Sequence, residues 1–293
     1  MKIYDCTIFL DEKMMYDLRL NLLNEHVYKF VVVESLYTHA GNKKKALFNI
    51  DDYKKFKDKI IYILLDKEPE DIFEVNENDP NIMGVKRLNS LKRIKLQYDS
   101  LLEGIKNADQ NDLIVVSDCD EIPKLNSINS EVKNKILIFK QYLYYFKLNL
   151  LYKNYDWYGS KACTKKNLRS FEWLKYVKNK KYNFWRIDTF FSNTKYTNIE
   201  IIEDGGWHFS KVKKPEDIYY TLSNYGEHNE FEKAGITTSN LKEYIDKGEL
   251  YYNHFADKSN PDKFSKNIKL EKNNKQLPKF ISENEDIYKE WLA

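Results

Sequence analysis

Three short apolar runs in the first part of the chain have the pattern of buried β-strands. They cover residues 29–34, 59–66 and 112–118. Continuous apolar runs of this length are typical of parallel strands that are buried on both faces. Between the second and third runs, apolar residues recur every three or four positions, which predicts one long helix. Its apolar face comprises Leu88, Leu91, Ile94, Tyr98, Leu101 and Ile105.

A strand, a helix and a strand at this spacing form a βαβ unit, so the first half is predicted to be an α/β sheet of the nucleotide-binding type. Ligands of such sheets bind beyond the carboxyl ends of the strands. The second half differs, because residues 136–151 are apolar and aromatic with partial alternation. This pattern predicts long antiparallel strands, and residues 182–210 indicate further strands.

The last part of the chain combines a helix, a polar segment and an apolar end. Residues 214–217 read Lys-Pro-Glu-Asp, which predicts the start of a helix because proline is favoured in the first turn. Residues 257–276 are rich in Lys, Asn and Asp and predict a surface loop. Residues 277–292 are apolar enough to pack back onto the domain.

Composition narrows the function classes. The 293 residues carry 48 basic and 45 acidic side chains, a net charge of +3, which disfavours a nucleic-acid-binding protein. No apolar run is long enough to span a bilayer, so no transmembrane segment is expected. Three scattered cysteines without a CxxC pair favour a reducing compartment, and we expect a cytoplasmic protein. Aromatic residues reach 15%, and their flat rings can stack on sugars.

The sharpest local signal is an acidic cluster at the end of the third apolar run. Asp118, Asp120 and Glu121 follow the buried residues of that run, and Pro123 ends the segment. Carboxylates at a strand end need a cation or water to compensate their burial. Carboxylate oxygens favour Mg²⁺ or Mn²⁺, which would bridge two phosphates of a nucleotide. The alternative is a solvated acidic loop.

A second cluster surrounds Gly205 and Gly206. Glu203 and Asp204 precede the glycines, and Trp207 and His208 follow them. Trp207 could stack on a ligand, and His208 could complete a metal site or donate to a phosphate. The alternative is a glycine turn with a core tryptophan and a hydrogen-bonded histidine.

Three weaker signals also point to ligand binding. Glu34 and His39 follow the first apolar run, where an acid could bind a ribose or a uracil edge. Arg93, on the predicted helix, could bind phosphate with its planar guanidinium. His228 and Glu230 form a third, polar group. A helix cap, a surface arginine and a polar turn are the respective alternatives.

Several well-known motifs do not occur in the sequence. It contains no GxxxxGK[ST] loop, no GxGxxG, no GxSxG and no HExxH. Their absence argues against a P-loop enzyme, a dinucleotide-binding enzyme, a serine hydrolase and a zinc protease.

Taken together and in order, the motifs resemble glycosyltransferase family 17, which transfers N-acetylglucosamine to N-glycans. The resemblance rests on residues 3–6, 19–21, 29–34, 38–41, Phe48, 92–93, 117–123, 157–159, 206–210, His228, Glu230, 277–278 and Phe280. It implies one GT-A type domain over residues 1–293. A nucleotide-sugar-binding half would span 1–123, an acceptor half 124–256, and a C-terminal loop and docking segment 257–293.

The resemblance also implies metal-dependent, inverting transfer from a nucleotide-sugar, with UDP-GlcNAc as the expected donor and a glycan or glycoconjugate as the acceptor. Asp118, Asp120 and His208 would hold Mn²⁺ or Mg²⁺. Glu34, His39, Arg93 and Asp118 would bind the donor. Inversion requires a carboxylate base, for which Asp204 and Asp188 are the candidates, followed by Glu203 and Glu230.

Two other functions stay open on sequence alone. A metal-dependent phosphoesterase or nucleotidyltransferase could use the same acids. A non-catalytic carbohydrate-binding protein could share the aromatic surface, although intact Asp118, Asp120 and His208 argue against loss of catalysis.

Overall fold

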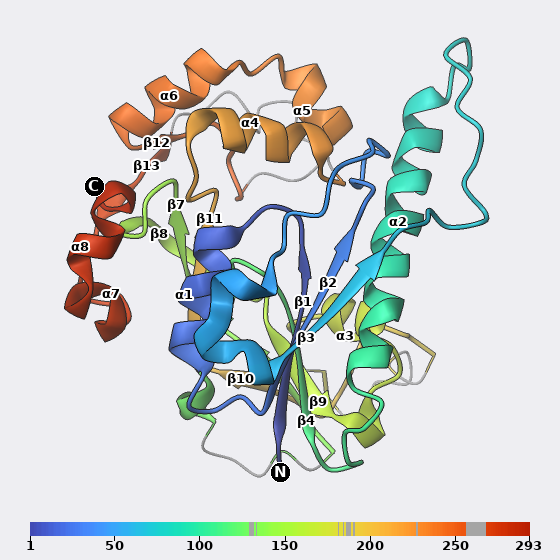
Figure 1. The fold of residues 1–293 in the computed structure, drawn as a ribbon, viewed down its shortest axis with the longest axis vertical. Coiled ribbons are helices and arrows are strands. Elements are labelled where there is room, and N and C mark those ends of the chain that lie inside the picture. Colours follow the sequence, from blue (N-terminus) through green and yellow to red (C-terminus); the bar gives the residue numbers. More distant parts are fainter. Residues whose placement is uncertain are drawn as a thin grey trace.

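A seven-stranded mixed sheet lies at the centre of the molecule (Figure 1). The computed structural model describes residues 1–128, 132, 134–180, 182–183, 185, 189, 191–226, 228–255 and 268–293. The strands of this sheet are β1 (Ile3–Phe9), β2 (Lys29–Ser35), β3 (Ile60–Leu65), β4 (Leu113–Asp118), β6 (Ile136–Phe139), β9 (Lys161–Thr164) and β10 (Ile199–Ile202). Their order is β10-β6-β9-β4-β1-β2-β3, and β4, β1, β2 and β3 run parallel. Their carboxyl ends therefore lie at one edge, where ligands of such sheets bind.

A second sheet begins where β4 ends. Its strands are β5 (Glu121–Pro123), β7 (Gln141–Tyr145), β8 (Leu150–Trp157), β11 (Gly206–Ser210) and β14 (Glu271–Lys272), in the order β14-β8-β7-β11-β5. Only Cys119 and Asp120 separate β4 from β5. The acidic turn is thus the junction between the two sheets. A separate pair is formed by β12 (Glu249–Leu250) and β13 (Ile268–Lys269).

Helices cover both faces of the central sheet. The helix α1 (Lys13–Leu23) and the 3₁₀ segment η1 (Ile50–Lys59) pack on one face, and α2 (Ile82–Gly104) and α3 (Phe171–Tyr176) pack on the other. In Figure 1, α4 (Pro215–Asn224), α5 (His228–Ala234) and α6 (Thr238–Lys247) lie above the carboxyl ends of β1 and β2. The remaining short elements are η2 (Leu125–Ser127), η3 (Lys165–Asn167), α7 (Lys279–Glu283), α8 (Glu285–Tyr288) and η6 (Lys289–Trp291).

The three predicted strands of the first half are confirmed as β2, β3 and β4, and the predicted helix is α2. Only part of the predicted apolar face is buried, however. Tyr98 and Leu101 are in the core, whereas Leu88 is 48% exposed and Leu91 is 36% exposed. Figure 1 shows the reason, since the first turns of α2 extend past the ends of the strands and have no sheet beneath them.

The central strand β1 was not predicted from the apolar pattern, because it contains a charged residue. Asp5 is buried in the middle of β1 and forms an ion pair of 2.5 Å with Arg19 of α1, which is also fully buried. Two hydrogen bonds make this pair bidentate. A paired carboxylate can occupy a core position that an unpaired one could not.

The prediction of long antiparallel strands in the second half was partly wrong. Residues 136–151 contribute to three strands, of which β7 and β8 do pair in antiparallel fashion. However, β6 pairs in parallel with β10, and β7 pairs in parallel with β11. Among the described residues of 182–198 there is no strand, so β10 and β11 alone represent the predicted strands of 182–210.

The end of the chain follows its predicted pattern only in part. The helix α4 begins at Pro215, in its first turn. Within the polar segment 257–276, the residues up to 267 lie outside the described residues, and 268–272 form short strands rather than a loop. Residues 277–292 pack back through Ile281 and Tyr288, which join the core beneath α1.

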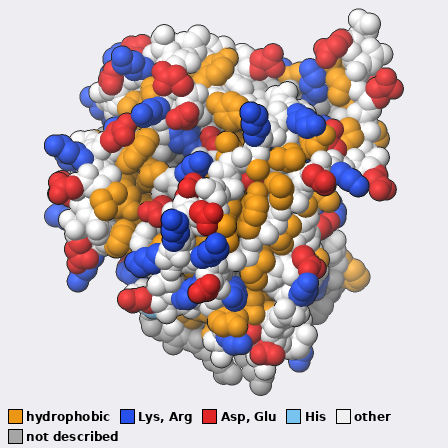
Figure 2. Space-filling view, viewed as in Figure 1, with side chains coloured by type: hydrophobic (Ala, Val, Ile, Leu, Met, Phe, Trp, Pro, Cys, Tyr) orange, Lys and Arg blue, Asp and Glu red, His pale blue; other side chains and the backbone are white. Residues whose placement is uncertain are grey.

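The surface reflects the nearly balanced charge. Figure 2 shows acidic and basic side chains intermixed over the described residues of one face, with apolar side chains between them. Among the described helices, none combines the length and apolar character that crossing a bilayer requires.

Candidate active site

The acidic turn 118–121 is held in place by the buried guanidinium of Arg19. Besides its pair with Asp5, Arg19 donates from Nη1 to the carbonyl oxygens of Asp118, Cys119 and Glu121, at 3.3, 3.4 and 2.6 Å. Turn carbonyls that leave a strand end have no ladder partner, and Arg19 supplies one. The turn is therefore anchored to α1 and β1 before any ligand binds.

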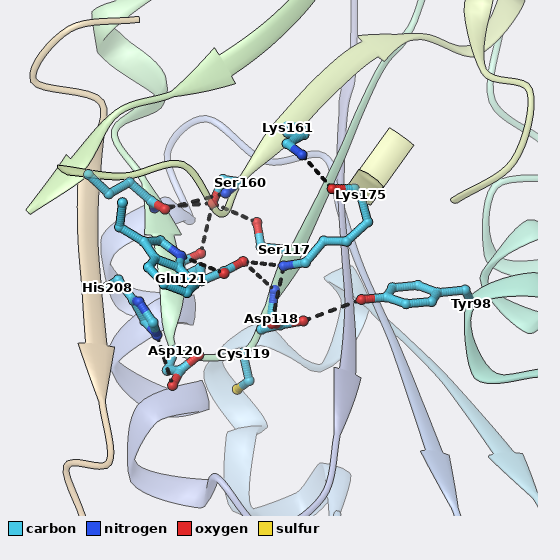
Figure 3. Close-up of polar contacts among 12 residues, drawn as sticks. Tyr98, Ser117, Asp118, Cys119, Asp120, Glu121, Ser160, Lys161, Lys175 and His208 are labelled. Carbon is cyan, nitrogen blue, oxygen red and sulfur yellow. Dashed lines mark hydrogen bonds and ion pairs between the residues drawn. The ribbon is translucent and has the colours of Figure 1, made fainter. Parts of the chain in front are cut away.

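Asp118 is the last residue of β4, and its carboxylate faces a lysine. Lys175 of α3 lies 3.1 Å from Asp118 Oδ2, and Tyr98 of α2 donates to Oδ1 at 3.4 Å (Figure 3). Burial raises the pKa of Asp118, an effect opposed by Lys175 and reinforced by Glu121 and Asp120. About a third of this side chain, 34%, is still exposed, so a ligand can reach it.

Asp120 and His208 meet across the start of the second sheet. Asp120 Oδ2 lies 3.4 Å from His208 Nε2, and the side chain of Asp120 is 24% exposed. Burial by itself would raise the pKa of Asp120, but His208, Lys211 and Lys213 outweigh it, so that the pKa lies below its ordinary value. The carboxylate is therefore ionised at neutral pH, as a cation ligand must be.

Glu121 lies behind these two acids and is almost fully buried, at 1% exposure. Its Oε2 accepts from the backbone N–H of Asp118 at 2.8 Å and pairs with Lys175 at 2.5 Å. Its Oε1 accepts from the indole of Trp157 at 2.8 Å. Burial would raise the pKa of Glu121, but Lys175 and His208 lower it below its ordinary value. Glu121 thus positions Asp118 (Figure 3), and it also fixes the indole of Trp157.

Lys161 of β9 and Lys175 of α3 complete this arrangement. Lys161, at the start of β9, donates to the carbonyl oxygens of Lys175 and Val177 at the end of α3. Burial and the charge of Lys175 lower the pKa of Lys161 to about 8. Lys161 therefore fixes the end of α3, which in turn places the Lys175 ammonium between Asp118 and Glu121.

Close packing explains the glycine beside Glu121. A Cβ on Gly159 would overlap Glu121 Oε1 and would lie 2.2 Å from its carboxyl carbon. Any larger residue at position 159 would displace the buried carboxylate.

A narrow pocket lies at the carboxyl ends of β1 and β2. It is lined by Ile8, Phe9, Leu10, Ser35, Tyr37, His39, Lys44, Gln97 and Tyr225. Burial lowers the pKa of His39 to about 4, so its ring is neutral at neutral pH. His39 Nδ1 is buried and has no hydrogen-bond partner in the described part of the chain. A buried polar atom without a partner is costly and suits a ligand contact.

Arg93 borders this pocket without lining it. It donates to Glu68 at 2.6 Å and to the carbonyl oxygen of His39 at 3.3 Å. It also lies close to Gly41, where a Cβ would be 2.6 Å from Arg93 Nη2. These contacts hold the loop that carries His39, and whether Arg93 also contacts a donor stays a prediction.

Glu34 has no exposed surface and its carboxylate is occupied within the fold. It pairs with Lys44 and accepts from the backbone N–H groups of Leu47 and Phe48 at 2.7 and 3.0 Å. Tyr62 donates to it at 2.8 Å. This arrangement supports a structural function for Glu34, which closes the chain after β2 onto the sheet, rather than the predicted ligand contact.

The candidates for the catalytic base are not gathered at the acidic turn. Asp204 is 52% exposed and pairs with Lys124, which follows β5 on the side away from Glu121. Glu203 is 71% exposed and pairs with Lys140. Glu230 lies in the first turn of α5. The remaining candidate, Asp188, lies outside the described residues.

The structure brings two of the three predicted metal ligands to one point. Among the described residues, no three His, Cys, Asp or Glu side chains are grouped closely enough to bind a metal ion. Asp120 and His208 do form a pair, and Asp118 belongs to the same turn. His208 Nδ1 is buried and, within the described residues, without a partner. An oxygen and nitrogen donor pair of this kind fits Mn²⁺ better than Mg²⁺.

Three residues of the site were not identified as such from the sequence: Arg19, Glu121 and Lys175. Glu121 was part of the acidic cluster, but its burial could not be read from its neighbours. Arg19 offered one signal, since a lone arginine within an apolar helix indicates a buried partner. Lys175 is one of many lysines in the sequence and carried no signal of its own.

Comparison with known proteins identifies the family. A comparison with curated proteins found no match to the chain. The family comparison, in contrast, matches residues 1–293 to glycosyltransferase family 17. The match covers the whole chain and includes every residue of the acidic turn, so the chain belongs to glycosyltransferase family 17.

Proposed function

We propose that the protein transfers a sugar from a nucleotide-sugar, UDP-GlcNAc as the first candidate, to a hydroxyl group of a glycan, in a metal-dependent reaction with inversion. The observation that carries this proposal is the meeting of Asp120 and His208 at 3.4 Å at the carboxyl end of β4. The strand order around β4 and the acidic turn between two sheets also fit a GT-A type fold.

Asp120 and His208 would hold a divalent cation, with Asp118 beside them. When bound, such a cation stabilises the negative charge that develops on the departing nucleoside diphosphate. Lys213 adds positive charge near Asp120. It pairs with Asp11 and lies 3.6 Å from Glu12, both of which follow β1. The lysines near the turn offset its acids, so a diphosphate is not repelled.

The nucleoside would bind over the mouth of the pocket that includes His39, since the pocket itself is too narrow in this structure to enclose it. It lies at the ends of β1 and β2, next to the strand that carries Asp118. Tyr225 offers an aromatic face, and the ring of His39 packs against it at 5.1 Å. The unpartnered Nδ1 of His39 would then bind a polar edge of the base or the ribose.

Inversion requires a carboxylate that accepts the proton of the acceptor hydroxyl. Asp204 is paired with Lys124 on the far side of β5, which weakens its candidacy. Asp188 is the candidate that we retain. Single substitutions of Asp204 and of Asp188 can therefore test which of the two residues is the base.

A thermal-shift and transfer experiment tests the proposal. The purified protein is heated with UDP, with UDP-GlcNAc and with other nucleotide-sugars, each with Mn²⁺ and with EDTA. We expect a stabilising shift with UDP and Mn²⁺ that EDTA removes, because a ligand of the native state stabilises it. Release of UDP from the matching donor distinguishes a transferase from a non-catalytic binding protein. Release of inorganic phosphate instead would support the phosphoesterase alternative, and no shift with any nucleotide would refute a nucleotide-sugar site.

A further inference from the structure

A groove along β8 combines aromatic rings with hydrogen-bonding groups. Its rings include those of Tyr155, Trp157 and Phe255, and its polar side chains include Asn154, Asp156 and Asn179. Phe255 is 62% exposed. Sugar rings have one face of C–H groups that stacks on aromatic rings and a rim of hydroxyl groups that binds amides and carboxylates. The lining therefore has the chemistry of a carbohydrate site.

A bulge in β8 creates the aromatic part of the groove. The interval from Leu151 to Asp156 on β8 faces only the interval from Tyr142 to Tyr144 on β7. Asn154 adopts a positive φ of 62° inside this bulge. Bulges redirect side chains and are frequent beside active sites.

The bulge and residues 254–255 together hold the rings in place. Tyr155 stacks on the buried Tyr152 with ring centroids 5.3 Å apart and an interplanar angle of 6°. Phe255 packs edge-on against Tyr155 at 5.1 Å. His254 lies beside both tyrosines, and its Nε2 is 3.0 Å from the hydroxyl of Tyr145. Rings that are fixed before binding lose little entropy when a ligand stacks on them.

The groove is continuous with the candidate active site through Trp157. The indole N–H of Trp157 donates to Glu121 at 2.8 Å, and its ring lies 4.5 Å from the ring of His208. One side of Trp157 thus belongs to the acidic turn and the other to the groove. A ligand in the groove would extend directly toward the acidic turn.

Two of the three charged side chains that line the groove are engaged within the protein, and the third is Lys178. Asp156 pairs with Lys140 at 3.0 Å, and the ammonium group of Lys161 is bound by backbone carbonyls. Apart from Lys178, the groups that the groove offers to a ligand are aromatic rings, amides and side chains already engaged within the protein, which suits an uncharged sugar chain.

We propose that the groove of Tyr155, Trp157 and Phe255 binds the uncharged oligosaccharide part of the acceptor and directs its reacting hydroxyl toward the turn 118–121. This inference rests on the proposed function for the identity of its ligand as an acceptor. The occupancy of the groove by an oligosaccharide can be measured separately from catalysis.

The first measurement is binding to an array of neutral oligosaccharides in the presence of UDP and Mn²⁺. We expect the wild-type protein to bind at least one oligosaccharide. Tyr155→Ala should weaken that binding about tenfold, because one stacking ring is lost. Tyr155→Phe keeps the ring and should bind like the wild type. Tyr28→Ala is the matched control. Tyr28 is 42% exposed and precedes β2, at the amino end of the strands of the central sheet, whereas the groove lies along β8 of the second sheet.

The second measurement separates the groove from the donor site. Tyr155→Ala should raise the acceptor KM about tenfold while leaving the stabilising shift by UDP and Mn²⁺ unchanged. Phe255→Ala repeats the test at an exposed ring whose removal leaves the stacked pair of Tyr152 and Tyr155 intact.

Each outcome decides the proposal. Equal binding by wild type and Tyr155→Ala would overturn the groove assignment, as would failure of the folded wild type to bind any oligosaccharide. If UDP does not stabilise the wild-type protein but the array binding depends on Tyr155, the donor proposal fails and the oligosaccharide groove stands.

Discussion

Glu34 and Asp120 are both acids at the carboxyl ends of parallel strands of the central sheet, yet their surroundings are opposite. Glu34, on β2, has no exposed surface and receives four contacts from the protein. Asp120, which follows β4, is 24% exposed and contacts His208 at the longer distance of 3.4 Å. An acid at a strand end is available to a ligand only when the protein leaves its oxygens accessible.

The two ends differ because of the chain that follows each strand. After β2 the chain returns, so that Lys44, Leu47 and Phe48 enclose the Glu34 carboxylate. After β4 the chain turns into the second sheet, and Arg19 binds the carbonyl groups of the turn rather than its carboxylates. One acid therefore stabilises the fold, while the other is left accessible to a cation.

The largest expected effect is the loss of activity when Asp120, the accessible acid, is substituted. Asp120→Asn should lower transfer by roughly a thousandfold or more, because the amide is a weaker cation ligand and lacks the negative charge. The melting temperature should fall only modestly, since the partly exposed side chain loses its pairing with His208 but fills no core position. Steady-state transfer assays and thermal melts of the same preparation measure both. A variant with near-normal transfer would mean that Asp120 does not hold a cation.

The equivalent acid-to-amide substitution of Glu34, the enclosed acid, should lower stability instead of activity. Glu34→Gln should lower the free energy of unfolding by about 3 kcal/mol, because the buried Lys44 loses its counter-charge. Urea denaturation measures this loss, and kcat of the folded fraction should stay near that of the wild type. The double variant Glu34→Gln, Lys44→Met should be less destabilised than Glu34→Gln alone. A Glu34→Gln protein that is fully stable but no longer binds UDP would instead restore the ligand contact predicted from the sequence.

His39, in the loop that follows β2, should make the free energy of unfolding depend on pH, with an effect of similar or smaller size. Its pKa is lowered by burial to about 4, from an ordinary 6.5. Above pH 6.5 the imidazole is neutral in both states, and its contribution to stability is complete. As the pH falls from 6.5 to 4, the unfolded chain binds a proton that the native state does not, so stability declines by up to about 3 kcal/mol. Below pH 4 this contribution no longer changes.

Urea titrations between pH 7.5 and 4 measure this decline. His39→Gln should show a shallower loss than the wild type over the same interval, with the remaining slope due to other groups, including His254. Identical slopes in both proteins would show that the imidazole of His39 is not buried in its neutral form.

The smallest effect is expected at the turn before β11. Asp204→Asn should leave kcat within about twofold of the wild type and cost less than about 1 kcal/mol of stability, as for an exposed ion pair. Asparagine also tolerates the positive φ of 48° at this position.

Asp188, the retained candidate for the base, gives the contrast to Asp204. Asp188→Asn should lower kcat by about 10²–10⁴-fold without weakening UDP binding. If Asp204→Asn lowers kcat strongly and Asp188→Asn does not, Asp204 is the better candidate for the base.

The local sequence pattern was sufficient for elements that consist of a continuous apolar run or of apolar residues at a regular helical spacing. The apolar runs predicted β2, β3 and β4, and the spacing from Leu88 to Ile105 predicted α2. The pattern failed at β1, because Asp5 is buried only with the help of Arg19, whose position on α1 depends on the packing of the whole sheet. A charge that is compensated by a distant residue looks, in sequence, like an exposed one.

The sequence by itself determined the α/β character of the first half, the acidic turn after β4 and the resemblance to glycosyltransferase family 17, because these depend on residues that are close along the chain. Only the tertiary structure decided which acids are accessible. Asp120 and His208 are 88 positions apart and meet because β5 and β11 are neighbours in the second sheet. Glu34 is enclosed, and Asp204 is directed away from the acidic turn, through contacts with residues that no local pattern connects to them.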